Sequence, residues 1–172
     1  MIHAIWNVRK DEDRARWTFT PLFSVGPLRF GMSPGEVAAA LDQVDRVSAA
    51  SCSVASSLQR FDDVGVTAYY EDGARLAGVA IHALSGPQVT LGREALVARV
   101  PSVLEAWICD HTRAYKLDLM YSHEGNPGSA DLGLLLRVQR AGDIVLTRPL
   151  FLTREWAMAA WDHLPQSEWS TF

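Results

Sequence analysis

Apolar residues at helical spacing mark the clearest element of the chain. The stretch VAAALDQV carries its valines and its leucine on one helix face, with alanines beside them. Ser33 precedes this stretch as an N-cap, Pro34 fills the first helical position, and Glu36 lies three residues after the cap. This arrangement is a capping box with proline where its missing N–H costs nothing. The pattern predicts a helix of roughly three turns that another element can approach closely.

Two runs of alternating residues around Asp72-Gly73 predict a β-hairpin. The Asp-Gly dipeptide accepts the positive φ angles of a type I′ turn, so we place these two residues at the centre of the turn. The resulting register pairs Tyr70 with Arg75, Ala68 with Ala77, Val66 with Val79 and Val64 with Ile81. One face of the hairpin is then small and apolar beyond the turn, which suits a surface that receives a helix.

The second half of the chain shows a further helix and three strand-like runs. Pro101 opens the helix, whose apolar side carries Val103, Leu104, Trp107 and Ile108. The strand-like runs cover 116–122, 132–140 and 144–151, and a polar loop at 123–131 separates the first two. A three-residue turn at 141–143 would place Val138 opposite Leu146 and Leu134 opposite Leu150. Thr153 is a candidate cap for a C-terminal helix.

The order of the predicted elements is helix, hairpin, helix, strands and terminal helix. The segments between them are interpreted as a loop (48–57), a short strand (88–91) and one or two helical turns (93–98). This order predicts the α+β class, with an antiparallel sheet and helices packed on one face. We expect a single domain over residues 1–172. The helix-then-strands order occurs twice, which admits two pseudo-repeated halves at 20–91 and 92–172.

Composition and charge place the chain among ordinary globular domains and argue against some partners. With 172 residues, 48% of them hydrophobic, the chain can bury a core without a metal or a disulfide. The formal net charge of −4 and the scattered arginines leave no basic stripe, so we expect no nucleic-acid partner. The N-terminal stretch lacks the features of a signal peptide, and no apolar run approaches the ~20 residues of a membrane span. We therefore expect a cytoplasmic protein with no membrane partner.

The residue types that commonly carry chemistry form no recognisable catalytic or metal-binding motif. The five histidines lie in five different segments, without the spacing of a zinc site. Cys109 and His111 lie two residues apart near a helix end, where side chains point away from one another, which disfavours a nucleophile–base pair. Cys52 and Cys109 form no disulfide framework, and their spacing leaves open whether they pair. We predict no catalytic residue, no metal ligand and no cofactor.

Candidate binding residues lie at the hairpin tip and in the polar loop. They are Tyr70, Glu71 and Asp72 at the tip and His123, Glu124 and Asn126 in the loop. The tip would offer an acidic knob to a basic partner, although ordinary turn chemistry explains the same residues.

The six tryptophans are numerous for a chain of this length. We expect Trp107 and one of Trp156 and Trp161 in the core. Three others lie in the terminal segments, where they either wrap the domain or anchor an interface: Trp6, Trp17 and Trp169.

The stretch LRFGMSPGEVAAALD resembles the recurring motif of a known fold. Its Gly-Met pair, capping residue, Glu-Val pair and helix-end leucine are similar to the motif of the β-lactamase-inhibitor-protein-like fold, which small outer-membrane assembly lipoproteins share. The resemblance implies units of helices followed by antiparallel strands, and protein binding rather than catalysis. The chain departs from that family in having no disulfide pair within each half. It also looks similar to small uncharacterised actinobacterial proteins, some of which neutralise toxins as immunity factors.

These observations favour a protein-binding module, such as an inhibitor or an immunity protein that neutralises a toxin or an enzyme by surface complementarity. The alternative is a small-ligand-binding protein or an enzyme whose site forms from distant segments, with Tyr69, His82 and Tyr121 as candidates. A structural subunit of a homo-oligomer is the third hypothesis.

Overall fold

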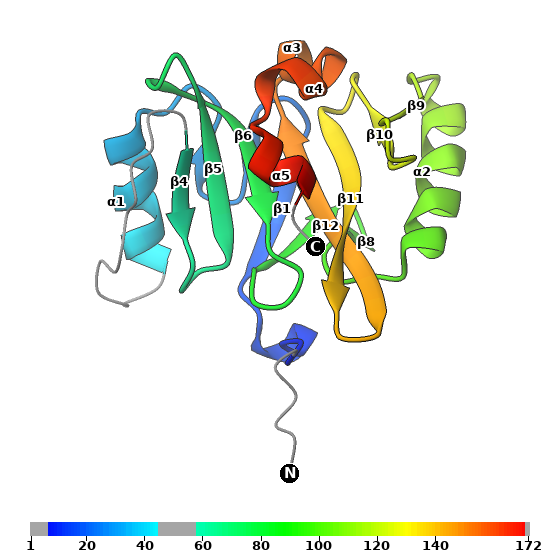
Figure 1. Ribbon diagram of the computed structural model, residues 1–172, viewed down its shortest axis with the longest axis horizontal. Coiled ribbons are helices and arrows are strands. Elements are labelled where there is room, and N and C mark those ends of the chain that lie inside the picture. Colours follow the sequence, from blue (N-terminus) through cyan, green and yellow to red (C-terminus); the bar gives the residue numbers. More distant parts are fainter. Residues whose placement is uncertain (1–6, 45–57, 171–172) are drawn as a thin grey trace.

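The fold consists of two β-sheets and a small set of helices, as seen in a computed structural model that describes residues 7–44 and 58–170 (Figure 1). The larger sheet contains β4 (Leu58–Phe61), β5 (Val66–Glu71), β6 (Arg75–Ile81), β9 (Met120–Tyr121), β10 (Pro127–Ser129), β11 (Leu134–Ala141) and β12 (Ile144–Leu152). The smaller sheet contains β1 (Arg16–Thr20), β2 (Ser24–Val25), β3 (Leu28–Arg29), β7 (Gln88–Leu91) and β8 (Glu94–Ala95). The helices are η1 (Asp11–Asp13), α1 (Pro34–Val44), α2 (Pro101–Tyr115), α3 (Arg154–Met158), α4 (Ala160–His163) and α5 (Gln166–Ser170).

The larger sheet is antiparallel throughout and has the strand order β4-β5-β6-β12-β11-β10-β9. Its two central strands, β6 and β12, come from different parts of the chain and pair through Ala80 and Leu150. The smaller sheet is mixed, because β1 runs parallel to β7 while its other pairs are antiparallel. The predicted α+β class is therefore confirmed. The division into pseudo-repeated halves stays a prediction.

The two faces of the larger sheet carry separate apolar clusters, because side chains alternate along each strand. On one face, Ala68 and Leu136 belong to a cluster that also takes in the smaller sheet, α1 and α2. On the other face, Tyr69 and Leu135 belong to a cluster that includes Trp156 of α3. In Figure 1, α5 lies over the middle of this sheet, whereas α3 and α4 lie at one end of its strands, between α1 and α2. The second face is thus covered by short helices from the C-terminal end.

The predicted capping box of α1 is confirmed. The backbone N–H of Ser33 donates to Oε2 of Glu36 at 2.8 Å, and the backbone N–H of Glu36 donates to Oγ of Ser33 at 3.3 Å. Val37 and Leu41 then lie in the core, as their spacing predicts. The predicted loop at 48–57 and the tryptophan Trp6 fall outside the described residues, as does Cys52.

The β5–β6 turn has the backbone that its Asp-Gly sequence predicts, but it is one residue longer. Asp72 and Gly73 have φ angles of 51° and 67°. The turn also takes in Ala74, whose N–H donates to the carbonyl of Glu71 at 3.0 Å. Glu71 therefore pairs with Arg75, and the predicted register is wrong.

A β-bulge shifts the hairpin further from the predicted register. The irregularity lies between Tyr69 and Tyr70, and beyond it Val66 pairs with Ile81. As a result Leu76 joins the larger apolar cluster with Ala68, whereas Ala77, which the predicted register places opposite Ala68, joins the smaller one. The extra residue lets the large side chain enter the larger core.

The β11–β12 hairpin also differs from its predicted register by one residue. Ala141 continues the strand and pairs with Ile144, so the turn has two residues, with Gly142 at a φ of 68°. Arg137 consequently lies directly opposite Arg148. This pairing places the guanidinium groups of Arg137 and Arg148 side by side, and both donate to the buried carboxylate of Glu168.

Other predicted elements differ in extent. The helix over α2 is confirmed with Leu104 and Ile108 buried, but Val103 is 57% exposed instead of lying in the core. The helical turns predicted at 93–98 are wrong, because this segment holds the short strand β8. Strand 88–91 is confirmed as β7, whereas only Met120–Tyr121 of the run 116–122 forms a strand. The C-terminal helix is broken into three short helices, the first capped by Thr153 as predicted.

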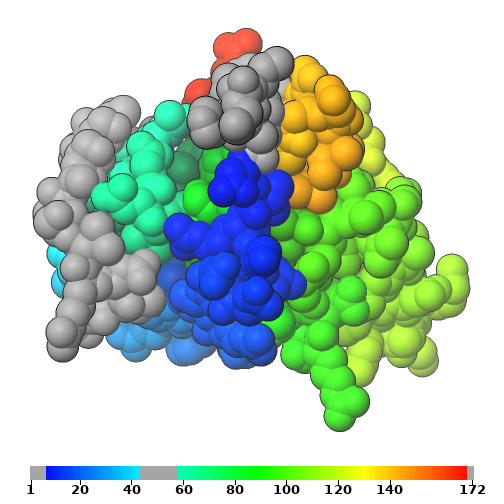
Figure 2. Space-filling view, turned by 90° about the horizontal axis from the view of Figure 1, so that it is seen from below, coloured from blue at the N-terminus to red at the C-terminus, as the bar shows by residue number. Residues whose placement is uncertain are grey.

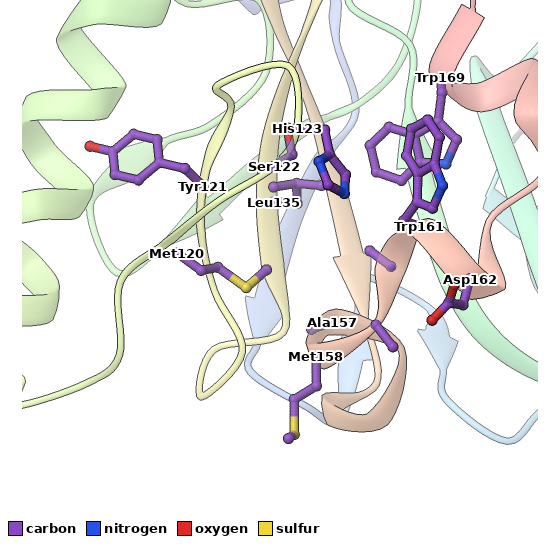
Figure 3. Close-up of a pocket in the computed structure, with 12 residues that line it drawn as sticks. Met120, Tyr121, Ser122, His123, Leu135, Ala157, Met158, Trp161, Asp162 and Trp169 are labelled. Carbon is purple, nitrogen blue, oxygen red and sulfur yellow. The ribbon is translucent and has the colours of Figure 1, made fainter.

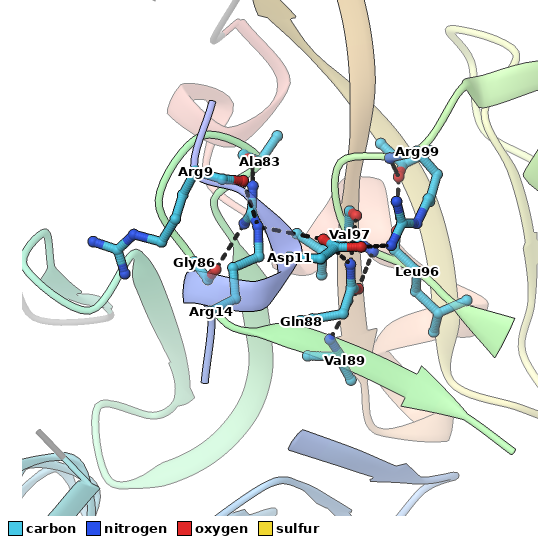
Figure 4. A network of polar contacts seen from close by, with 11 residues as sticks. Arg9, Asp11, Arg14, Ala83, Gly86, Gln88, Val89, Leu96, Val97 and Arg99 are labelled. Carbon is cyan, nitrogen blue, oxygen red and sulfur yellow. Dashed lines mark hydrogen bonds and ion pairs between the residues drawn. The ribbon is translucent and has the colours of Figure 1, made fainter. Parts of the chain in front are cut away.

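A buried arginine attaches the N-terminal segment to the rest of the domain (Figure 4). Arg14 donates to the carbonyl oxygens of Ala83 and Gly86, at 2.7 Å each, and to that of Arg9 at 3.0 Å. Figure 2 shows this segment in blue, lying across one side of the molecule between the residues around β4 and those around α2. Because its donors are satisfied by backbone carbonyls, Arg14 has a structural role.

Candidate functional site

A concavity lies between the β9 edge of the larger sheet and the C-terminal helices. It has a volume of about 390 Å3. It is lined by Met120, Tyr121, Ser122, His123, Leu135, Ala157, Met158, Ala159, Ala160, Trp161, Asp162 and Trp169 (Figure 3). We call this concavity the C-terminal groove. Its volume lies at the lower end of the range of small-ligand sites.

Three aromatic rings gather along one side of the C-terminal groove. The ring centroids of His123 and Trp161 lie 5.3 Å apart in an edge-on arrangement, and those of Trp161 and Trp169 lie 5.2 Å apart. Figure 3 shows these rings grouped together, whereas Tyr121 points away from them. Trp161 is 52% exposed and Met158 is 71% exposed. Large apolar side chains thus line the groove and continue onto the open surface.

The broken helix explains why Trp161 faces outward. Ala159 adopts φ −139° and ψ 45°, which is not a helical conformation and separates α3 from α4. Trp156, in α3, is buried and stacks on His163 with 5.1 Å between ring centroids. The sequence prediction that one of Trp156 and Trp161 is a core residue is therefore confirmed for Trp156. In an unbroken helix, Trp161 would have lain on the helix face that the buried residues Trp156 and Ala157 define.

A buried ion cluster fixes the wall of the groove that carries Trp169. Oε1 of Glu168 accepts hydrogen bonds from Arg137 at 2.9 Å and from Arg148 at 3.0 Å. Its Oε2 accepts from Arg148 at 2.9 Å and from the hydroxyl of Tyr69. The Arg137 guanidinium also lies 5.2 Å from the centre of the Trp169 ring. Helix α5 is therefore attached to the sheet by charged groups that have almost no access to water.

The electrostatics of this cluster keep Glu168 ionised. Burial raises its pKa, but the attraction and hydrogen bonds of Arg148, aided by Tyr69 and Arg137, outweigh burial and hold the pKa below the usual range of a glutamate. Burial, and then the charge of Glu168, raise the pKa of Tyr69, so this phenol stays protonated. The lowered pKa of Glu168 and the raised pKa of Arg148 keep both groups charged near neutral pH, so the cluster acts as a charged structural anchor.

A second, smaller pocket contains a histidine beside a serine. It has a volume of about 150 Å3 and is lined by Asp62, Gly65, Val66, Thr67, His82 and Ser85. Oγ of Ser85 lies 3.4 Å from Nδ1 of His82. Such a pair is what a hydrolase needs when the histidine can accept the serine proton.

The hydrogen bonds of Gln139 argue against His82 as an acceptor of the Ser85 proton. Oε1 of Gln139 accepts from the backbone N–H of Ala83 at 3.0 Å, so its Nε2 is the atom that donates to Nε2 of His82 at 2.8 Å. Nε2 of Gln139 also lies 3.4 Å from Nδ1 of His82, but the shorter contact to Nε2 places the proton of the neutral ring on Nδ1, 3.4 Å from Oγ of Ser85. Burial, followed by the charge of Arg148, lowers the pKa of His82 to about 4. His82 is a neutral donor in this arrangement and gives Ser85 no general base.

The residues predicted at the hairpin tip do not all face solvent. Tyr70 is buried, and its hydroxyl donates to Oε1 of Gln59. Glu71 forms an ion pair with Arg75 at 3.0 Å, and Asp72 is exposed. An acidic group is thus displayed at the tip, but the ring of Tyr70 belongs to the core.

Of the residues predicted in the polar loop, some are also exposed and one is buried. His123 lines the C-terminal groove, and Glu124 is exposed. Asn126 is buried and donates to Oγ of Ser122 at 3.1 Å, which holds the loop closed. The strands β12 and β11 separate the β5–β6 hairpin of the tip from β10, so β6 and β10 lie roughly 14 Å apart at the usual strand spacing. The two groups therefore form two surfaces, and binding by either stays a prediction.

The distant-segment candidates for a catalytic or ligand site do not meet. Tyr69 belongs to the ion cluster, His82 to the smaller pocket, and Tyr121 lies at the rim of the C-terminal groove. The hydroxyl of Tyr121 contacts Cys109 and donates to Glu105, and these hydrogen bonds raise its pKa to about 12. Cys109 is a free cysteine. Sequence reasoning missed Met158 and Asp162, because an unbroken helix pattern gave no sign of the surface they share with His123.

The described residues contain no group of three or more histidine, cysteine, aspartate or glutamate side chains placed to hold a metal ion. No helix in the described ranges has the length and apolar character needed to cross a membrane. A scan against protein-family models, a search of curated proteins and a search of solved structures found no match to this chain. The resemblance to the β-lactamase-inhibitor-protein-like fold stays a hypothesis drawn from the sequence.

Proposed function

We propose that this protein is a protein-binding module and that the C-terminal groove is its interaction surface. The observation that carries the proposal is the exposure of Trp161 and Met158 beside a groove already lined by aromatic rings. Exposed tryptophan next to a concavity is typical of the anchor positions of protein interfaces. Methionine adapts its shape to a partner at low cost, because its side chain is unbranched and polarizable.

The rigid backing of the groove supports the same function. A preformed surface loses less conformational entropy on binding than one that must become ordered. The ion cluster around Glu168 attaches α5 to β11 and β12, so the Trp169 wall exists before a partner arrives. Inhibition or neutralisation of an enzyme or toxin by surface complementarity, as expected from the sequence, is compatible with such a surface.

A small-ligand-binding protein is the second candidate, favoured by the groove volume of about 390 Å3. The position of the apolar residues distinguishes the two functions. In a ligand site most of the apolar surface lies inside the pocket, whereas here Met158 continues it onto the open surface with 71% of the residue exposed. We therefore place protein binding first.

Affinity purification with matched baits tests the proposal. The full-length chain, its Met158→Ala/Trp161→Ala variant and its Phe23→Ala variant would each be used to capture proteins from the cells that encode the chain. Phe23 is the control because it is an exposed aromatic, 59% exposed, in the β1–β2 turn outside the groove. We expect a stoichiometric complex with the wild type and with Phe23→Ala, weakened at least tenfold by the double alanine variant.

A fourth bait distinguishes the groove from the hairpin tip. Glu71→Lys/Asp72→Lys reverses the charge of the tip and leaves the groove intact. Loss of the complex with this variant, together with full retention by the double alanine variant, would assign the interface to the tip and refute the groove. Self-association of the wild type that the double alanine variant abolishes, detected by light scattering, would identify a second copy as the partner.

A further inference from the structure

We infer that the C-terminal groove receives a basic side chain of the partner, with arginine as the best fit. This inference rests on the proposed function, because it specifies the chemistry of what the groove binds. Two features carry it: the charges around the groove, and the exposure of Trp161.

The formal charge that lines the groove is negative. Asp162 is the acidic residue among the lining residues, and it is exposed. The lining residues include no lysine or arginine. Glu124 is also exposed, and its Oε2 accepts a hydrogen bond at 3.2 Å from Oγ of Ser122, which lines the groove, so a second carboxylate lies beside it. An incoming cation therefore meets attraction and no fixed like charge among the groups that line the site.

The arginines nearest to the groove are already engaged. Arg137 lies against the Trp169 ring and donates to Glu168 at 2.9 Å. Arg154, in α3, forms an ion pair with Asp131. Both guanidinium groups are thus held in ion pairs, and neither lines the groove.

The shape of the groove suits a long cationic side chain. Trp161 is 52% exposed, and a tryptophan ring is the best aromatic surface for a cation, on which the planar guanidinium group of arginine stacks. Met120 and Ala160 line the groove and provide apolar contact for the methylene stem. Asp162, adjacent in sequence to Trp161, contributes an exposed carboxylate to the lining of the groove. One arginine can thus contact the apolar lining with its methylene stem, and the Trp161 ring and a carboxylate with its guanidinium group.

Selection of peptides against the full-length chain tests this inference without knowledge of the natural partner. A phage-displayed library of random twelve-residue peptides would be selected on the wild type, with Phe23→Ala as a positive control and Trp161→Ala as the counter-screen. We expect enriched peptides to contain arginine beside apolar residues. Replacing that arginine by norleucine should weaken binding at least about tenfold, as loss of both a charge contact and a cation–π contact implies.

A double-mutant cycle then locates the contact. Asp162→Asn should weaken the arginine peptide at least about threefold and leave the norleucine peptide unchanged, which is the signature of a direct pair. Glu155→Gln is the matched control, since Glu155 is exposed on α3 and does not line the groove. Unfolding curves of all variants verify that they remain folded.

The outcomes separate the two proposals. Peptides that depend on Trp161 but are neutral or acidic would overturn the basic-side-chain inference and leave the groove as the interaction surface. A selection that yields no peptide dependent on Trp161 or Met158 would refute both. Arginine peptides that are equally sensitive to Glu155→Gln and Asp162→Asn would show long-range attraction in place of the inferred contact.

Discussion

Glu168 is 2% exposed, yet it is the acceptor for two arginines and a tyrosine. Replacing Glu168 by Gln would leave Arg137 and Arg148 buried without their carboxylate. We expect Glu168→Gln to lower the free energy of unfolding by about 3–5 kcal/mol, the cost of breaking a buried ion pair by removing one partner. Urea denaturation followed by tryptophan fluorescence would measure the loss.

An exposed glutamate provides the comparison for Glu168→Gln. Glu155→Gln removes a carboxylate of the same type from the surface of α3 and should change the free energy of unfolding by less than about 0.5 kcal/mol. If both variants lose equally little free energy of unfolding, the cluster does not hold α5 in place. The account of a preformed Trp169 wall would then be wrong.

At the scale of elements, helix α1 depends on its N-terminal cap. Oγ of Ser33 accepts from the N–H of Glu36, one of the N–H groups that the first helical turn leaves without an internal partner. We expect Ser33→Ala to lower the free energy of unfolding by about 1 kcal/mol. Chemical denaturation would measure this difference.

Ser102→Ala is the control for Ser33→Ala. Ser102 lies in the first turn of α2, whose N-cap is Val100 and makes no side-chain hydrogen bond. We expect its replacement to change stability by less than about 0.5 kcal/mol. Equal losses in the two variants would mean that a serine near a helix start matters here for some reason other than capping.

At the scale of the whole molecule, the lowered pKa values of His82 and of several carboxylates make the folded state less stable in acid. The pKa of His82 is about 4 in the folded protein, below its ordinary value of 6.5, so below pH 6.5 the unfolded state binds the proton more readily. The pKa values of Glu168, Asp118 and Asp11 are lowered as well. For these carboxylates, stability is present above their unfolded pKa and is lost as pH falls through the folded one.

We predict that the free energy of unfolding falls in two stages on acidification. Between pH 7.5 and 4.5, His82 should account for about 2 kcal/mol of the fall, given its shift from 6.5 to about 4. Denaturation curves of the wild type and of His82→Gln across this range would measure it. The variant should show a flatter dependence down to pH 4.5, followed by the same steep loss in stronger acid. Parallel curves for the two proteins would show that His82 titrates normally.

The sequence by itself determined the features that depend on a few neighbouring residues. The capping box of α1, the positive φ angles at Asp72 and Gly73, and the Thr153 cap are local hydrogen bonds and backbone preferences, so residue type and spacing suffice to predict them. The α+β class follows from the order of such elements. The groove was only partly visible in this way: His123 was predicted from the polar loop, whereas Met158 and Asp162 were not.

Only the tertiary structure decided what distant residues do together. The bulge between Tyr69 and Tyr70 and the two-residue turn before Ile144 changed both hairpin registers, because packing against two apolar clusters selects among turns of similar local energy. Glu168 meets Arg148 across 20 residues and Tyr69 across 99. The C-terminal groove likewise joins the β9 edge to a helix broken at Ala159. Contacts of this kind depend on the path of the whole chain, and no short pattern along it encodes them.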